Sequence, residues 1–334
     1  EHLPEQIRIA WDGTREVKVP VGHKKCDRIV IAGMGGSALG PDIIQRALFS
    51  SLKVSLEVVR GYELPKYTNS KTLVILSSFS GNTEEIVSAS KDAKAKKAKC
   101  MVITTGGKLK AFAKRVNCPL YTFAPGNLAK EPRLGVGFSF AGVLGLLERA
   151  GYIKLGERQV RGMTKAMSDV IDTCSLEINE DQNPAKIVAQ ELQDRSILLV
   201  ASQHLLGNAH TLSNQINESA KQYSRHVELP EMNHHLMEGL SFPKGNFKNF
   251  SVLMIKSKVY HSRIQKRYDI TADVFEKQGG KVIDYEVRGK TVLEECAELL
   301  QFGSFLSYYL GILNKVDLVA IPHVSYFKEK MKKK

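Results

Sequence analysis

The stretch LSSFSGNTEE, residues 76–85, gathers hydroxyl side chains between an apolar run and an amphipathic one. Ser78, Ser80 and Thr83 stand within six positions around a single glycine. A phosphate monoester carries close to two negative charges, and hydroxyls together with the free N–H groups of a helix N-terminus bind it well. Each hydrogen bond to a charged group contributes roughly 1.5–3 kcal/mol. Because helix N-capping explains one hydroxyl and not three, the pattern favours a phosphate-binding site.

A glycine-rich turn, GMGGSALG at residues 33–40, follows the first apolar run. Gly33, Gly35 and Ala38 fit the G-x-G-x-x-A pattern of dinucleotide-binding turns, so a nicotinamide dehydrogenase is one alternative. Ser37 favours a phosphate monoester instead, because it adds a side-chain donor where a pyrophosphate site uses backbone N–H groups. A tight strand-to-helix turn that binds nothing is the other alternative.

The segments that must position these turns alternate between apolar runs and amphipathic stretches. Continuous apolar runs predict buried strands at residues 27–35, 53–61, 71–78, 100–107 and 118–126. Helices are predicted between the strands, among them 40–51 with Pro41 in its first turn and 82–98 with Thr83 as N-cap. Such regular alternation predicts a parallel sheet with helices on both faces.

The second half repeats this alternation after a middle segment of different character. Residues from about 150 to 195 are charged and helical in period. Further strands are predicted at 196–202, 250–257 and 281–287, and helices at 210–224, 261–278 and 293–315. We therefore predict an α/β fold of two doubly wound, flavodoxin-like domains at residues 1–152 and 196–334, joined by a helical connector at 153–195.

The composition is that of a soluble globular protein of two domains. The chain has 334 residues, of which 43% are hydrophobic and 25% are charged. No run approaches the roughly 18 apolar residues of a membrane span, and the segment EHLPEQIRIAWDG has no secretory apolar core. The five cysteines are scattered, without CxxC spacing. We expect a cytoplasmic protein with neither a membrane association nor a disulfide or zinc framework.

The net charge of +13 raises the question of a nucleic-acid partner. Part of the excess lies in KDAKAKKAKC and in the final KEKMKKK, which are typical of solvated helix faces. Basic and aromatic residues are not interleaved, and no nucleic-acid-binding module is recognisable. We expect no nucleic-acid partner, because a basic surface equally attracts phosphorylated metabolites.

Five separated segments resemble one family when they are taken together. GGS, with Gly36 and Ser37, and the later SFSGNTEE resemble a sugar isomerase (SIS) domain. EPRLGVGFSF at 131–140, NQINESAKQYSRHVELPEMNHHLMEG at 214–239 and VSYFKEKM at 324–331 resemble the bifunctional phosphoglucose/phosphomannose isomerase family. The resemblance covers nearly the whole chain. It implies two SIS-type domains, a role in glycolysis and gluconeogenesis, and a homodimer in which His234 enters the neighbouring subunit's site.

The resemblance also implies a set of site residues. The substrate phosphate would be bound by Gly36, Ser37, Ser78, Ser80 and Thr83. The implied activity is the interconversion of glucose 6-phosphate and fructose 6-phosphate, and of mannose 6-phosphate as a further substrate, through a cis-enediolate. A phosphosugar-binding regulator without catalysis is the alternative, and it would need the hydroxyls but no acid–base residues.

The chemistry of aldose–ketose interconversion can be matched to residue types. One carboxylate can move a proton between adjacent carbons, and positioned acid–base catalysis contributes roughly 10²–10⁴-fold. Glu218 fits this base, and a surface pair with Lys221 is the alternative. Histidine titrates near neutral pH, which suits proton transfer at the ring oxygen. His234 and His235 are equivalent on chemistry alone, and the family spacing from Glu218 selects His234.

Two further residues complete the predicted site. Arg133 can stabilise the negative charge of an enediolate, with a surface ion pair as the alternative. Lys328 would assist ring opening, an assignment that rests on the resemblance because KEKMKKK offers many lysines.

The chain departs from the family pattern at two places. ASQHLLGNAH keeps only Gly207 of a glycine-rich turn, and VDLVAIPH lacks the threonine of dual-specificity members. The resemblance therefore supports the phosphoglucose reaction more directly than the phosphomannose reaction. We expect no cofactor and no metal, because no H-x-H or H-x-x-x-H accompanies a carboxylate in register.

Overall fold

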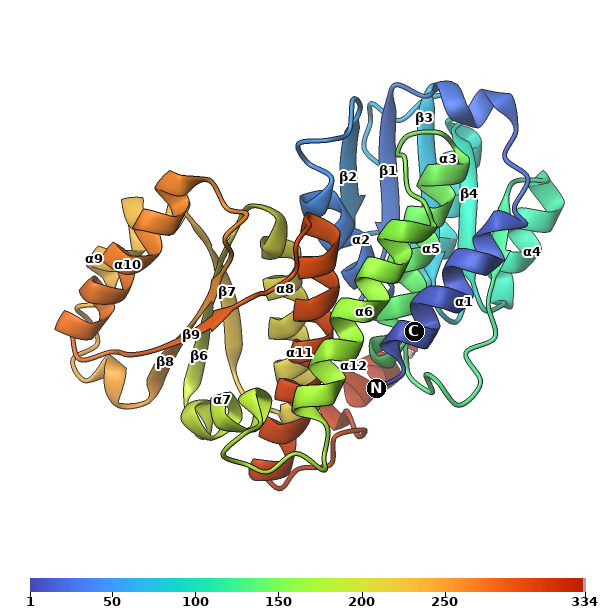
Figure 1. Cartoon of the computed structure of the whole chain (residues 1–334). Helices are drawn as coiled ribbons and strands as arrows, with labels where there is room; N and C mark the ends of the chain where they lie inside the picture. The colour runs from blue at the N-terminus through green and yellow to red at the C-terminus, as the bar shows by residue number, and fades with distance from the viewer. Residues whose placement is uncertain (333–334) are drawn as a thin grey trace. The chain divides into compact units, whose positions relative to one another are not determined.

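The computed structural model describes residues 1–332 as two compact units (Figure 1). Unit 1 comprises residues 1–169, 203–211 and 288–299, and unit 2 comprises 170–202, 212–287 and the described residues from 300 to 332. Both units are discontinuous in sequence, because helices α6 (Glu157–Cys174), α8 (Leu206–Gln215) and α11 (Val292–Leu313) each contribute residues to both. The division of the chain at residues 152 and 195 stays a prediction.

Unit 1 is built around a five-stranded parallel sheet. Its strands are β1 (Arg28–Gly33), β2 (Ser55–Val59), β3 (Thr72–Ser78), β4 (Lys99–Thr104) and β5 (Leu120–Thr122). The strand order is β2-β1-β3-β4-β5, the flavodoxin-like order in which the chain changes direction between β1 and β3. All of β3 is buried, as its continuous apolar sequence predicts.

Helices cover both faces of this sheet. Besides the three helices that it shares with unit 2, unit 1 contains α1 (Leu3–Arg15), α2 (Gly36–Ala47), α3 (Glu84–Ala95), α4 (Gly107–Val116) and α5 (Val136–Arg149). Helices α3 and α4 form one apolar core with alternate residues of the strands, such as Val74 and Val102. Helices α1 and α5 pack on the opposite face (Figure 1). There a Cβ at Gly142 would lie 3.2 Å from the ring of Tyr121. The predicted doubly wound architecture is confirmed.

Unit 2 contains a second parallel sheet of four strands. The strands are β6 (Ser196–Ser202), β7 (Ser224–Leu229), β8 (Phe250–Lys256) and β9 (Lys281–Glu286), in the order β7-β6-β8-β9. Its remaining helices are α7 (Pro184–Leu192), α9 (Leu236–Gly239), α10 (Ser262–Lys277) and α12 (Pro322–Lys332). Among residues 1–332, no helix combines the length and the apolar character that crossing a bilayer requires.

Two predicted helices were wrong in their bounds. Helix α2 begins at Gly36 and not at residue 40, so Pro41 lies in the helix interior and not in its first turn. The helix predicted for 210–224 ends earlier, and Ser224 opens strand β7, which the sequence analysis missed. Strand β7 is short and mostly half-buried, so its apolar residues give no strong periodic signal.

Candidate active site

The N-termini of helices α2 and α3 follow β1 and β3, the two strands at which the sheet order reverses. Ligands of open α/β sheets bind outside the carboxyl ends of the strands at such a switch point. Gly33 pairs in register with Ser77, so the turn after β1 and the turn after β3 leave the sheet side by side. These two turns and the residues directly beside them carry a set that we call the hydroxyl cradle: Gly36 and Ser37 at the start of α2, Ser78 at the end of β3, and Ser80 and Thr83 between β3 and α3.

Hydrogen bonds link the two turns of the hydroxyl cradle. Ser37 Oγ accepts from the backbone N–H of Phe79 over 2.8 Å, and Ser37 is buried. Ser78 Oγ and Thr83 Oγ1 lie 2.9 Å apart, and the backbone N–H of Gly81 donates to Ser78 Oγ over 3.1 Å. The structure therefore brings the predicted serines and threonine together in unit 1.

Thr83 occupies the predicted N-cap position of α3, but its side chain makes no capping hydrogen bond. Its hydroxyl instead bonds that of Ser78. Ser80 is exposed, and its Oγ accepts from the backbone N–H of Asn82 over 3.2 Å. Hydroxyls that are not used as caps remain able to rotate toward an anion, because a hydroxyl both donates and accepts.

Gly81 is required where it stands for two reasons. Its φ of +67° lies in the left-handed region, and a Cβ would lie 1.9 Å from the carbonyl oxygen of Gly106. The backbone N–H of Leu109 donates to the carbonyl of Gly81, and that of Thr105 donates to the carbonyl of Phe79. The turn after β4 thus supports the turn that carries Ser78, Ser80 and Thr83.

Arg133 lies beside the first turn of α2. A Cβ on Gly36 would lie 2.6 Å from the carbonyl oxygen of Pro132 and 2.9 Å from the backbone nitrogen of Arg133. The short helix that carries Arg133, Pro132–Leu134, can approach α2 this closely only because residue 36 has no side chain. Arg133 is 6% exposed, so its guanidinium is held in the protein and does not extend into bulk water.

Glu218 and His234 lie in unit 2 near opposite ends of β7. Glu218 is half-buried in a π-helical turn (Ile216–Ala220) whose Asn217 bonds Ser224, the first residue of the strand. His234 is exposed and closes a short helix (Glu231–His234) that follows the last residue of the strand. A six-residue strand spans roughly 20 Å, so the structure does not bring these two residues together within one chain.

The remaining candidates of unit 2 are exposed. His235 Nε2 lies 3.5 Å from a carboxylate oxygen of Glu231. The choice of His234 over His235 stays a prediction. Lys328 is exposed on α12. Lys221 Nζ donates to the backbone carbonyl of Glu218 over 2.7 Å.

The structure also shows supporting residues that the sequence analysis missed. Ser77, which is buried, donates from Oγ to the backbone carbonyl of Ser37 over 2.9 Å. Asn217 binds both the helix before Glu218 and the strand after it. For Ser77 the sequence held a usable signal in Pro41. A proline in a helix leaves the carbonyl four residues earlier, here that of Ser37, without its helical partner, so another donor must bind it.

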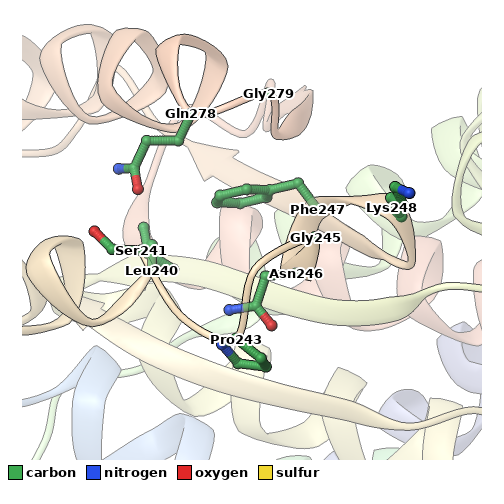
Figure 2. A pocket seen from close by; sticks show the side chains of 9 residues that line it. All are labelled: Leu240, Ser241, Pro243, Gly245, Asn246, Phe247, Lys248, Gln278 and Gly279. Atoms are coloured by element: carbon green, nitrogen blue, oxygen red, sulfur yellow. The ribbon is translucent and has the colours of Figure 1, made fainter.

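A separate pocket of about 500 Å³ opens in unit 2 beside the end of α10. Figure 2 shows the ring of Phe247 and the amide of Gln278 facing it, with Leu240 and Pro243 on the opposite side. None of the predicted site residues lines this pocket. Residues 1–332 also contain no group of three or more histidine, cysteine or acidic side chains that could hold a metal ion.

Two family models match the chain. The SIS domain model matches residues 24–127, and the model of the bacterial phospho-glucose isomerase C-terminal SIS domain matches residues 181–331. The first match contains the hydroxyl cradle, and the second contains Glu218, His234 and Lys328.

Proteins of known family match over almost the full length. The bifunctional phosphoglucose/phosphomannose isomerase of Caldicellulosiruptor bescii is 34% identical over 99% of this chain and 97% of its own. The protein of the same name from Aquifex aeolicus is 30% identical over 91% of this chain and 90% of its own. A crystal structure of a glucose-6-phosphate isomerase from Chlamydia trachomatis shares the fold, with a TM-score of 0.72 and 14% identity. The match covers 98% of this chain and 72% of the Chlamydia chain.

Proposed function

The chain belongs to the bifunctional phosphoglucose/phosphomannose isomerase family, and from this we propose that it interconverts glucose 6-phosphate and fructose 6-phosphate, with mannose 6-phosphate as a second aldose substrate. The observation that carries the proposal is the hydroxyl cradle at the β1/β3 switch point, beside the buried Arg133. A dianionic phosphate matches the hydrogen-bonding groups gathered there.

In the proposed reaction, one set of residues binds the phosphate and another set carries out the chemistry. Gly36 and the hydroxyls of the cradle bind the phosphate. Glu218 removes a proton from one carbon and returns it to its neighbour. Arg133 stabilises the negative charge of the cis-enediolate, and a guanidinium that is already fixed and little exposed suits this task because it needs little reorganisation. His234 and Lys328 assist ring opening. The proposal includes no metal, cofactor or nucleic acid.

A coupled assay on the purified protein tests this function. With fructose 6-phosphate as substrate, we expect glucose 6-phosphate and mannose 6-phosphate to form, each measured by its own coupling enzyme. Glu218→Gln should abolish both activities and still bind a phosphorylated sugar acid. Glu238→Gln, an exposed glutamate in α9, is the matched control and should retain them. A wild-type protein that binds fructose 6-phosphate without turnover would favour the alternative function, a phosphosugar-binding regulator without catalysis.

We also propose that the enzyme is a cytoplasmic homodimer in which His234 of the partner subunit completes each site. The separation of Glu218 and His234 along β7 and the exposure of His234 support this arrangement. Mixing the Glu218→Gln and His234→Ala proteins tests it. Heterodimers would contain one site with both residues intact, so an equal mixture should regain about one quarter of wild-type activity. No recovery after verified subunit exchange would assign both residues to one chain.

A further inference from the structure

Glu218 lies in a π-helical turn, Ile216–Ala220, that continues helix α8. The turn forms the C-terminal end of the helix, with Lys221 as its C-cap, and π-helical backbone is rare in proteins. The turn ends at Lys221, whose φ of +55° is left-handed and uncommon for a residue with a side chain. A backbone held in this way depends on contacts that stabilise it.

The side chain of Asn217, the residue before Glu218, makes the contacts that span this turn. Its Nδ2 donates to the carbonyl of Ser213 over 2.7 Å and to the carbonyl of Ser224 over 2.9 Å. Its Oδ1 accepts from the backbone N–H of Ser224 over 3.2 Å. The amide thus pairs with both polar backbone groups of Ser224, as a neighbouring peptide would, and Ser224 is buried at the start of β7.

The carbonyl of Ser213, which the Asn217 side chain binds, is also a backbone acceptor of the helix. In an α-helix this carbonyl would accept the backbone N–H of residue 217, four positions later. The side chain of Asn217 competes for the same acceptor, and a side chain that inserts into the i→i−4 ladder disrupts the regular α-helix locally. The hydrogen bonds of Asn217 therefore favour the wide turn and tie it to the sheet at once.

The carbonyls at the end of the turn are bound by other side chains. Lys221 Nζ donates to the carbonyl of Glu218 over 2.7 Å, and Asn314 Nδ2 donates to the carbonyl of Ala220 over 3.0 Å. Helix ends leave such carbonyls without backbone partners, so these bonds stabilise the C-terminus of the turn. They do not reach β7, so within the turn itself Asn217 provides the hydrogen bonds to the strand, beside the bond that Ser213 of α8 makes to Ser224.

We infer that Asn217 is a positioning residue for the proton transfer: its amide fixes the π-turn against β7 and thereby sets the direction of the Glu218 carboxylate. This inference rests on the proposed function. A displacement of about 1 Å in a reacting group can cost about 100-fold in rate. The proposed phosphate-binding residues belong to unit 1 and not to this turn. Loss of Asn217 should consequently lower kcat and leave KM nearly unchanged.

Steady-state kinetics of Asn217→Ala and Asn217→Asp with fructose 6-phosphate test the inference. Asn217→Asp keeps the acceptor for the N–H of Ser224 and loses the donor to the carbonyls of Ser213 and Ser224. Because it retains one of the three hydrogen bonds, it provides the test if the alanine variant does not fold. We expect kcat to fall at least about tenfold in both variants, with KM within about twofold. Hydrogen exchange should become faster at residues 216–221.

Ser213→Ala is the matched control. Ser213 Oγ donates to the same carbonyl of Ser224 over 2.9 Å, so its removal deletes a hydrogen bond at the same strand end without touching the Asn217 amide. We expect a comparable loss of thermal stability and a kcat within about twofold of wild type. Equal kcat losses in Ser213→Ala and Asn217→Ala would reduce Asn217 to a structural role and overturn the inference.

The inference and the proposed function fail in different ways. If the wild type is active and Glu218→Gln is inactive, an Asn217→Ala enzyme with wild-type kcat overturns only the role of Asn217. If the wild type has no isomerase activity, the proposed function is wrong and the inference falls with it.

Discussion

Ser77 Oγ donates a hydrogen bond of 2.9 Å from strand β3 to the backbone carbonyl of Ser37 in the first turn of α2. In an α-helix the N–H of residue 41 would bind that carbonyl, but residue 41 is a proline and has no N–H. The serine hydroxyl therefore supplies the hydrogen bond that the proline cannot make. It also ties the helix that carries Ser37 to the strand that leads to Ser78.

A double-mutant cycle tests this relationship. Ser77→Ala should lower the free energy of unfolding by about 1–3 kcal/mol, because the buried carbonyl of Ser37 loses its partner. Pro41→Ala restores a backbone N–H at the helical position. In the Pro41→Ala background the Ser77→Ala change should therefore cost less, as measured by urea unfolding. Additive losses would show that the two residues do not share this acceptor.

Loss of two hydroxyls should weaken substrate binding. Replacing both Ser80 and Thr83 with alanine should raise KM for fructose 6-phosphate by more than about tenfold, because two hydrogen bonds to a dianion are removed. Steady-state kinetics with thermal unfolding as a folding check provide the measurement. An unchanged KM would remove these two residues from the phosphate site.

Gly36→Ala should disturb the packing between the start of α2 and the segment that carries Arg133. The new Cβ would meet the carbonyl of Pro132 at 2.6 Å, so α2 and the segment that carries Arg133 must separate. We expect a loss of about 1–3 kcal/mol in the free energy of unfolding, and a drop in kcat/KM. Gly239→Ala is the control, since nothing lies within 4 Å of its Cβ. Equal kcat/KM in the two variants would contradict the proposed closeness.

The pH dependence of stability should reflect His23. Burial lowers the pKa of His23 below its ordinary value near 6.5, with a further contribution from Lys99, although the hydrogen bond with the carbonyl of Cys100 opposes the shift. Its Nδ1 is buried without a partner. Because the unfolded chain binds this proton more readily, stability is present above about pH 6.5 and is lost as the pH falls below it.

The measurement is the thermal midpoint at about pH 7.5 and about pH 5.5. His23→Gln can keep the donor to Cys100 and cannot titrate, so its midpoint should fall less between the two pH values than that of the wild type. An identical fall in both proteins would assign the acid sensitivity to other groups.

Isomerase activity should survive dialysis against EDTA. The proposed mechanism stabilises the enediolate with Arg133 and moves the proton with Glu218, so chelation removes nothing that it needs. The coupled assay before and after dialysis provides the comparison, with a zinc-dependent enzyme as positive control. Loss of activity that added zinc restores would contradict this prediction.

Much of unit 1 could be predicted from the sequence because its signals are local. A fully buried parallel strand needs a continuous apolar run, and β3 shows one. The glycines and hydroxyls of the two turns stand next to those strands in sequence, so their place at the sheet edge followed from the fold class. The order of the motifs likewise indicated the family before any contact was known.

The supporting contacts could not be read in this way, because they join residues far apart in the sequence. Ser77 and Ser37 are 40 positions apart, and the register of β1 against β3 brings them together. Helix α2 begins four residues before the predicted start because the helix accommodates Pro41 once a strand residue satisfies the freed carbonyl.

In unit 2 the tertiary structure also decided the backbone around Glu218. A helical period predicted a helix through residue 224, whereas the amide of Asn217 pairs with Ser224 and the chain enters β7 there. The sequence by itself determined which side chains are available for chemistry and which elements carry them. Only the tertiary structure decided how they are held, because hydrogen bonds between distant segments override local propensity where the chain turns.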